Sequence, residues 1–420
     1  MEAVVFNPDE PLAPVTAPAN ALKPPKKEYF YALDALRGFA AMAVAFFCHY
    51  VPYFSKSEAD FKKALFLFPV YEQVAMWLRT NGWLAVDFFF CLSGFIFYHM
   101  YKEKIAERRI ELKDFAVLRI SRLFPLHWLA LGVVVVVRVL GVLTGDGKIV
   151  WYKAVNSNLL SLLQTTFLFQ AFRPGEVRLW NDPAWSLSFE FIGYFIFFLV
   201  IWLMGKSKNT KKNSFLFLLA PILIGLAALQ FGWNQLPFFG VVNGRNEGER
   251  FLVSFFIGCI AYEIYKRCKE NKKLQGIVAA VSAALIVGLV ALQTRPDPNK
   301  LFGNWLVVFQ LLVMPSIILL VVNCRPLNKF LSLGLFRWLG NLSFSIYLWH
   351  FPIILTMRYV STLMGTPWAF TSRRFFWLYV LLTLVIAHCS HYYFERPMQA
   401  LIRKKYFARK REKELASVAD

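Results

Sequence analysis

Residues 33–50 read LDALRGFAAMAVAFFCHY, an apolar stretch long enough to enter a bilayer that nevertheless carries Asp34, Arg37 and His49. A bilayer core needs about 20 mostly apolar residues per helix. An ionisable side chain inside it costs about 2.5–3.5 kcal/mol, so such groups usually face a water-filled cavity or a partner. The stretch therefore predicts a membrane helix, and its polar side chains indicate a functional site.

The composition of the whole chain agrees with a membrane protein. Of 420 residues, 57% are hydrophobic and only 17% are charged, against about 25% charged residues in soluble domains. The net charge of +21 comes from short basic runs between apolar segments, which argues against a nucleic-acid partner. The six cysteines are scattered without a CxxC pair, so neither a disulfide framework nor a zinc site is predicted.

Apolar segments of membrane-spanning length recur along the chain. They predict an all-α polytopic membrane protein with about ten transmembrane helices. The ten segments centre on residues 35–54, 82–101, 123–143, 184–204, 214–233, 251–266, 275–294, 304–322, 338–357 and 374–394. The run NLLSLLQTTFLFQAF, residues 158–172, is too short to span and predicts a re-entrant or interfacial segment.

Basic residues give the orientation of these helices. The strongest basic runs precede the first segment and follow the second, fourth, sixth and tenth, so all lie on one side. Cytoplasmic loops carry the excess of Lys and Arg, which places both termini in the cytoplasm. We expect a disordered cytoplasmic tail without a cleavable signal peptide over residues 1–30, a transmembrane domain over residues 31–398 and a basic cytoplasmic tail over residues 399–420.

The first helix carries residues suited to catalysis. Histidine takes up a proton near neutral pH, so His49 is a candidate general base. Arginine keeps its charge and suits a carboxylate, a phosphate or a developing oxyanion. The alternative is that Asp34 and Arg37 lie at the cytoplasmic interface while His49 forms a hydrogen bond within the bundle.

Two further stretches carry polar groups among apolar residues. In NGWLAVDFFFCLSGFIFYHMY, residues 81–101, Asp87 indicates a site, whereas Ser93 with Gly94 suits either a site or close helix packing. In LRISRLFPLHW, residues 118–128, Arg119 and Arg122 lie three residues apart and project from nearly one helix face. They suit an anionic group, and the excess of cytoplasmic basic residues explains them equally well.

Three stretches in the second half of the chain carry the remaining candidates. Glu190 lies inside NDPAWSLSFEFIGYF, residues 181–195, where pairing with a buried arginine competes with a catalytic role and Trp185 suits an interfacial anchor. His350 precedes a proline by two residues in FRWLGNLSFSIYLWHFPIIL, residues 336–355, and is either an inward site residue or a structural histidine. His388 and His391 lack a third ligand, so no metal is expected.

In this order the stretches resemble the acyltransferase 3 family of bacterial membrane O-acyltransferases. The matching motifs are LDALRG with a downstream histidine, DFFFCLSGFI, RISRLFP, WSLSFE, LSFSIYLWHFP and FERP, and they cover residues 31 to about 400. The resemblance implies transfer of an acyl group, usually acetyl, from cytoplasmic acyl-CoA to a hydroxyl. The implied acceptor is a cell-surface polysaccharide, the O-antigen of lipopolysaccharide or a lipid-linked sugar, reached from the bacterial inner membrane and its lipids.

The resemblance also implies roles for individual residues. His49 would be the base for the acceptor hydroxyl, Glu190 would orient or charge-balance it, and Arg37 would hold the donor or stabilise charge on the thioester oxygen. Arg119 and Arg122 would bind the phosphates of acetyl-CoA, and a periplasmic acyl-transfer partner would be another chain. The remaining pocket candidates are Asp34, Asp87, Ser93, Trp185 and His350.

One spacing departs from the family pattern. The family's arginine and histidine are usually separated by ten residues, whereas eleven lie between Arg37 and His49. At about 100° per residue, a step of twelve positions turns the two side chains about 120° apart on a regular α-helix. A π-bulge, which absorbs one extra residue, would restore the alignment. Without it the two residues would act on different surfaces.

Other functions use the same buried charges. A transporter or flippase of a lipid-linked sugar needs them without a base, and formation of an acylated product that depends on acyl-CoA separates it from an enzyme. A scaffold for glycan assembly would not need so many chemistry-bearing stretches. Within the enzyme class, a small secondary metabolite is the alternative acceptor.

Overall fold

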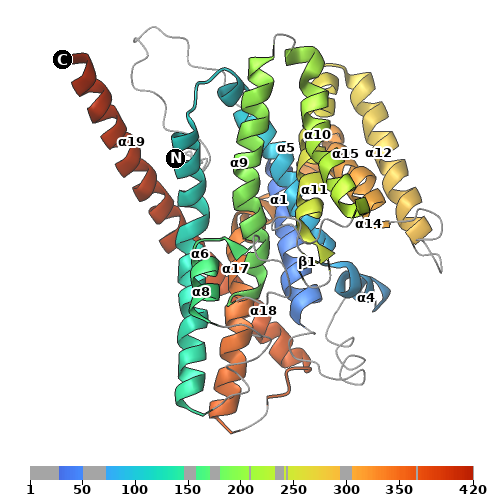
Figure 1. Cartoon of the computed structure of the whole chain (residues 1–420). Coiled ribbons are helices and arrows are strands. Elements are labelled where there is room, and N and C mark those ends of the chain that lie inside the picture. The colour runs from blue at the N-terminus through green and yellow to red at the C-terminus, as the bar shows by residue number, and fades with distance from the viewer. Residues whose placement is uncertain are drawn as a thin grey trace.

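The structure is a computed structural model, and it describes residues 28–50, 72–145, 158–170, 180–207, 210–231, 241–242, 245–293, 305–365 and 368–419. Helices make up nearly all of these residues, and Figure 1 shows them as a bundle from which the C-terminal helix extends. The only strands among the described residues are β1 (Val241–Val242) and β2 (Arg245–Asn246), a short antiparallel pair. The fold class predicted from the sequence is confirmed.

The helices of the first half follow one another in the predicted order. They are α1 (Tyr31–Met42), η1 (Ala43–His49), α4 (Glu72–Asn81), α5 (Leu84–Ala106), α6 (Leu112–Leu143), α8 (Leu159–Thr166), η3 (Asp182–Ala184), α9 (Trp185–Lys206) and α10 (Thr210–Phe231). The second half contains α11 (Glu247–Cys268), α12 (Lys272–Gln293), α14 (Trp305–Val308), η5 (Phe309–Val313), α15 (Met314–Asn323), α16 (Arg325–Leu331), α17 (Gly334–Leu363), α18 (Arg373–Ser390), η6 (His391–Glu395) and α19 (Arg396–Ala419).

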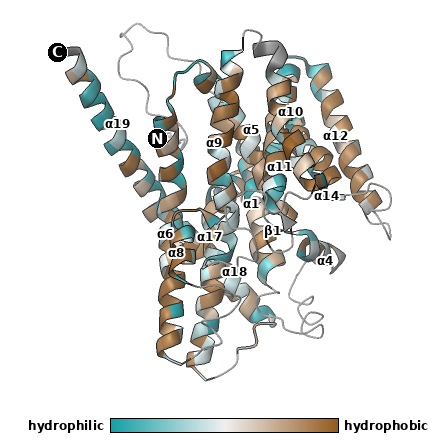
Figure 2. Cartoon of the chain, in the orientation of Figure 1, coloured by the Kyte–Doolittle hydropathy of each residue, from teal (hydrophilic) through white to brown (hydrophobic). Residues whose placement is uncertain are grey.

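Eight helical stretches among the described residues are long and apolar enough to cross a membrane. Figure 2 shows apolar residues dominating α6, α9 and α12 in particular. The other two predicted segments correspond to α11 and α17, which are helices of 22 and 30 residues. Both are richer in polar residues, and most of their side chains are buried against other helices, where lipid does not exclude polar groups. The protein is a polytopic membrane protein.

Glycines bring two pairs of helices into close contact. A Cβ atom on Gly94 of α5 would lie 1.8 Å from the carbonyl oxygen of Phe255 in α11, and one on Gly258 would lie 2.0 Å from that of Cys91. A Cβ atom on Gly340 of α17 would likewise lie 2.2 Å from the carbonyl oxygen of Asp34 in α1. Small residues permit such backbone approach. The packing role weighed for the Ser93–Gly94 pair is therefore present at Gly94.

Three π-helical segments interrupt the described α-helices. They are η1 after α1, η5 between α14 and α15, and η6 between α18 and α19. Each contains a polar residue that contacts another buried side chain: His49 in η1, Gln310 in η5 and His391 in η6. A π-turn takes up an extra residue and is frequent at functional sites. The segment η1 lies between Arg37 and His49, where the one-residue excess in the sequence suggested a π-bulge.

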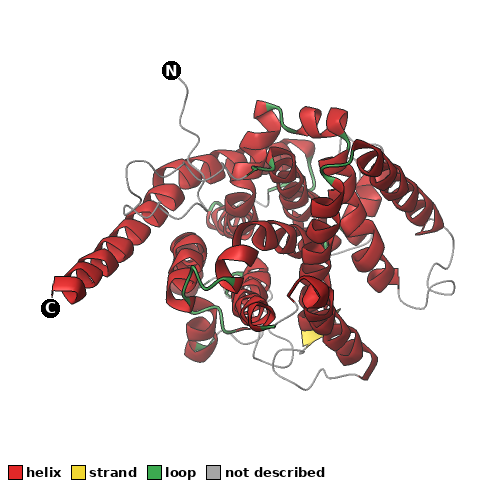
Figure 3. Cartoon of the chain, turned by 90° about the horizontal axis from the view of Figure 1, so that it is seen from above, coloured by secondary structure: helices red, strands yellow, loops and turns green. Residues whose placement is uncertain are grey.

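Two segments outside the main bundle also have defined structure. The predicted re-entrant or interfacial run contains α8, whose Leu159, Leu160 and Leu163 are exposed. His127 and Trp128 of α6 hold the end of α8 through hydrogen bonds to the Thr165 and Thr166 carbonyls. The expected basic tail after residue 398 is part of α19, which Figures 1 and 3 show extending away from the other helices.

Candidate functional site

A cavity of about 500 Å³ lies between α1, α5, α6, α9 and α17. Its size is within the range of small-molecule sites, about 300–1,000 Å³. Apolar side chains form much of the wall, and the polar groups include two arginines, one carboxylate and several hydroxyls. The lining residues are Arg37, Val86, Phe89, Phe90, Ser93, Arg122, Leu123, Ser186, Leu187, Glu190, Ser343, Phe344 and Tyr347.

Arg37 and Arg122 supply the positive charge of the cavity. Arg37 comes from α1, and within the described part of the chain its side chain has no recorded hydrogen bond or ion pair. The Arg122 guanidinium, from α6, lies 5.8 Å from the centre of the Phe344 ring. Arginine binds carboxylates and phosphates through a planar fork of donors. The arrangement therefore suits an anionic ligand.

Glu190 faces the same cavity from α9. Its carboxylate accepts hydrogen bonds from Ser93, 3.4 Å away, and from the hydroxyl of Tyr194. The prediction that Glu190 orients His49 does not match these contacts. A glutamate on α9 has its own partners on α5 and α9, and the His49 ring contacts α17 instead.

Arg119 lies apart from Arg122 although only three residues separate them. Its side chain is 1% exposed, it does not line the cavity, and its Nη2 donates to the Tyr101 hydroxyl at 2.6 Å. Four aromatic rings surround the guanidinium, with centres 4.8–5.7 Å from Cζ: Phe97, Tyr101, Phe115 and Tyr194. Such cation–π contacts stabilise a buried arginine. Arg119 therefore braces the tyrosine that binds Glu190.

His49 and His350 form a pair close to the cavity. The Nδ1 atom of His49 lies 2.9 Å from Nε2 of His350, and Nδ1 of His350 lies 2.6 Å from the Tyr347 carbonyl oxygen. That carbonyl only accepts, so His350 donates from Nδ1 and a neutral His350 ring accepts at Nε2. His49 then donates from Nδ1. In a neutral His49 ring the lone pair therefore lies on Nε2, the nitrogen a general base would use.

The histidine pair and the cavity are connected through α17. Tyr347 lines the cavity and lies three residues, about one helical turn, before His350. Along α1 and η1, the twelve positions from Arg37 to His49 correspond to about 18 Å. Both residues face α17, because Arg37 lines the cavity with Ser343 and Tyr347 while His49 contacts His350. The two act on one side of the helix but at different levels.

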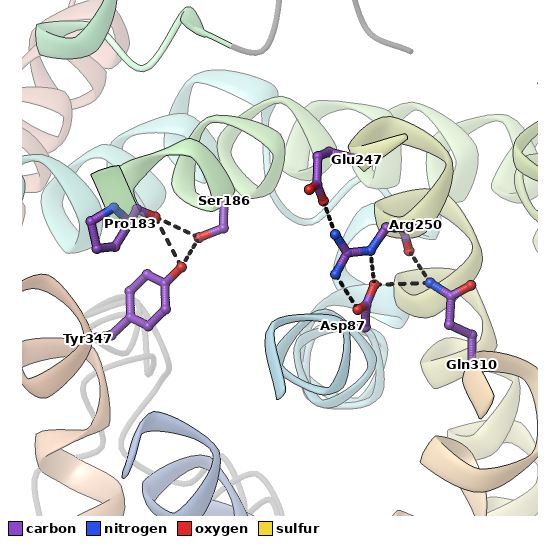
Figure 4. A network of polar contacts seen from close by, with 7 residues as sticks. All are labelled: Asp87, Pro183, Ser186, Glu247, Arg250, Gln310 and Tyr347. Atoms are coloured by element: carbon purple, nitrogen blue, oxygen red, sulfur yellow. Dashed lines mark hydrogen bonds and ion pairs between the residues drawn. The ribbon is translucent and has the colours of Figure 1, made fainter. Parts of the chain in front are cut away.

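Asp87 belongs to a separate buried network, drawn in Figure 4. Its carboxylate pairs with Arg250, whose Nε and Nη2 lie 3.0 and 2.5 Å from the two oxygens. Arg250 also pairs with Glu247, and Gln310 of η5 donates to Asp87 at 3.0 Å. Asp87 is fully buried and does not line the cavity. The network joins α5, α11 and η5.

The last two pocket candidates also lie outside the cavity wall. Asp34 is buried on α1, where its backbone abuts Gly340 of α17. Trp185 begins α9, and its ring centre lies 5.8 Å from the Arg250 guanidinium. Of the eleven or fewer residues that the sequence singled out, the structure thus brings four to the cavity: Arg37, Ser93, Arg122 and Glu190.

Sequence reasoning missed several polar residues that lie here. Tyr347 exchanges a hydrogen bond with Ser186 at 2.8 Å and donates to the Pro183 carbonyl at 3.0 Å, as Figure 4 shows. Ser343 also lines the cavity. Helical spacing could have found them, because Tyr347 and Ser343 precede His350 by three and seven residues and Ser186 precedes Glu190 by four.

Known proteins provide an independent comparison. The chain is 26% identical over 349 residues to the peptidoglycan O-acetyltransferase OatA of Listeria monocytogenes, covering 76% of this chain and 51% of that protein. It is 25% identical over 345 residues to the putative peptidoglycan O-acetyltransferase YrhL of Bacillus subtilis, with 76% and 51% covered. It is 26% identical over 358 residues to the O-acetyltransferase OatA of Staphylococcus aureus, with 80% and 55% covered.

The chain thus spans about half the length of the curated relatives it matches. No solved structure matches it significantly. The family comparison covers far more of this chain, because residues 30–390 match an acyltransferase domain. That range includes every helix that lines the cavity and both members of the histidine pair. The chain belongs to the acyltransferase 3 family.

Proposed function

We propose that the protein is a multi-pass O-acyltransferase of the bacterial inner membrane, with both termini in the cytoplasm. It moves an acetyl group from cytoplasmic acetyl-CoA to a hydroxyl of a cell-envelope glycan. The observation that carries this proposal is the cavity with two arginines placed about one helical turn from a histidine pair whose outer ring presents Nε2 as its basic nitrogen. The names of the relatives support acetyl as the acyl group.

Arg37 and Arg122 hold the anionic part of the donor in this proposal. A general base acts within about 2.6–3.2 Å of the proton it takes, so the reacting hydroxyl and thioester meet beside His49. Arg37 lies about 18 Å further along the same helix, too far to stabilise charge on the thioester oxygen. Of its two suggested roles, holding the donor is therefore the one retained. Glu190, on the same cavity, offsets part of the arginine charge.

His49 performs the proton transfers. Its Nε2 takes the proton of the acceptor hydroxyl as the oxygen attacks the thioester carbonyl carbon. When the C–S bond breaks, the proton passes from His49 to the departing thiolate, which leaves as CoA thiol. The products are an acetyl ester and free CoA, and His49 returns to its starting state. His350 keeps the Nδ1 proton of His49 in place, as its contact with the Tyr347 carbonyl favours.

Arg119 takes a positioning role, because it lies among aromatic rings rather than on the cavity. The acceptor is a cell-surface glycan, with peptidoglycan named for the relatives and O-antigen or a lipid-linked sugar as the other members of the same class. A periplasmic acyl-transfer partner completes the proposal. Acceptor and donor approach from opposite sides of the membrane, and the polar groups along α17 line the route between them.

Mass spectrometry of cell-envelope glycans tests this function. Glycans from cells that express the protein are expected to carry an added acetyl group, about 42 Da per site, which is lost when the gene is removed and returns when it is restored. A longer increment would exclude acetyl but keep acyl transfer. Unchanged ester content, together with a changed distribution of lipid-linked sugar across the membrane, would instead support a flippase.

A further inference from the structure

The C-terminal helix α19 is tied to the start of α6, the helix that carries Arg122. Arg403 of α19 is 7% exposed, and its guanidinium donates to the Ser121 hydroxyl at 3.0 Å and to the Leu118 carbonyl at 3.3 Å. Nearer the end of α19, Lys410 pairs with Asp114 at 2.8 Å, and Tyr406 donates to the same carboxylate at 3.1 Å. The contacts run along the first three turns of α6.

The turn that Arg403 contacts is weakened by a proline. Pro125 lies inside α6 and has no backbone N–H, so the Ser121 carbonyl loses the hydrogen bond it would accept in a regular helix. A proline also favours a kink in the preceding turn. Arg403 contacts this turn from outside, through the Ser121 side chain and the Leu118 carbonyl. The Ser121 hydroxyl itself donates to the same carbonyl at 3.0 Å.

The same turn ends at Arg122. Ser121 is the residue before it, and the Leu118 carbonyl is the acceptor that the Arg122 N–H meets in an α-helix. The direction of the Arg122 side chain into the cavity therefore depends on a turn that Pro125 loosens and Arg403 holds. The residues of α19 lie beyond the range of the family match, which ends at residue 390.

We infer that Arg403 is a positioning residue for the donor site, so that α19 forms part of the machinery that binds acyl-CoA. This inference rests on the proposed function, because it takes Arg122 as a ligand for the donor anion. The charge of Arg403 alone does not explain the arrangement. Its guanidinium is spent on a hydroxyl and a carbonyl of α6, and a planar fork suits two such acceptors.

Donor binding by the full-length protein in lipid nanodiscs tests the inference. We expect Arg403→Met to raise the KM for acetyl-CoA and the Kd for free CoA about tenfold, with kcat changed less than about twofold. Arg411→Met removes the same charge from an exposed position on α19 and is expected to bind CoA like the unaltered protein. Ser121→Ala removes one acceptor of Arg403 and should act in the same direction if Arg403→Met fails to fold.

A double-mutant cycle separates positioning from general support of the fold. On an Arg122→Met background, Arg403→Met is expected to cause no further loss of CoA affinity, because the group that it positions is gone. Equal affinity of Arg403→Met and the unaltered protein, or losses that multiply in the double variant, would overturn the inference. If the unaltered protein bound no CoA, the donor proposal and this inference would both fail.

Discussion

Protein with His49→Ala is expected to transfer acetyl groups about 10²–10⁴ times more slowly than the unaltered protein. Alanine removes the nitrogen that takes the proton of the acceptor hydroxyl, while the cavity that holds the donor keeps all its lining residues. The KM for acetyl-CoA should therefore change little. Rates of ester formation by purified protein measure the loss, and membrane extraction with size-exclusion chromatography checks that the variant inserts and folds.

A second histidine serves as the matched control for this variant. His99 contacts the Tyr262 hydroxyl at 2.9 Å and the Glu28 carbonyl at 2.9 Å, and it does not line the cavity. His99→Gln should keep its activity. His350→Ala is expected to fall between the two, because His49 keeps its nitrogen but loses the acceptor that fixes its Nδ1 proton. Normal turnover by His49→Ala would remove His49 from the mechanism.

Asp87→Ala is expected to cost about 3–5 kcal/mol of folding free energy, because it leaves the buried Arg250 without its main carboxylate. Arg250 and Asp87 are at most 4% exposed, so water cannot replace the lost partner. The remaining Glu247 contacts only one side of the guanidinium. The apparent melting temperature in detergent, measured by intrinsic tryptophan fluorescence, should fall clearly relative to the unaltered protein.

An exposed ion pair provides the comparison. Glu107 and Arg109 are each 58% exposed, and such pairs contribute at most about 1 kcal/mol. Glu107→Gln should leave the melting temperature nearly unchanged. If Asp87→Ala were as stable as Glu107→Gln but lost acetyl transfer, Asp87 would belong to the chemistry, as the sequence alone allowed, rather than to the network that joins the helices.

Most of the fold could be predicted from the sequence because long apolar segments leave few alternatives in a membrane. The extra residue between Arg37 and His49 even pointed to the place where η1 forms. The pairing of helices was less accessible. Segments such as α5 and α9 are apolar on nearly all sides, so periodicity does not show which face meets which neighbour.

The site shows the same division. Arg37, Ser93, Arg122 and Glu190 were found as polar groups in apolar surroundings, and the structure brings them together. The partner of His49 was expected to be Glu190, yet the ring contacts His350, because α1 packs along α17. Arg250 escaped attention since it lies one residue before the apolar segment predicted over residues 251–266, so the pairing of Asp87 could not be foreseen.

The central claim is that this chain moves an acetyl group from acetyl-CoA to a glycan hydroxyl. Its most direct test is the incubation of purified protein in nanodiscs with radiolabelled acetyl-CoA and cell-envelope glycan, followed by measurement of label released from the glycan by mild alkali. We predict alkali-labile label that accumulates with time, depends on acetyl-CoA and is absent with His49→Ala. Glycan that stays unlabelled, although the protein binds both glycan and CoA, would contradict the account.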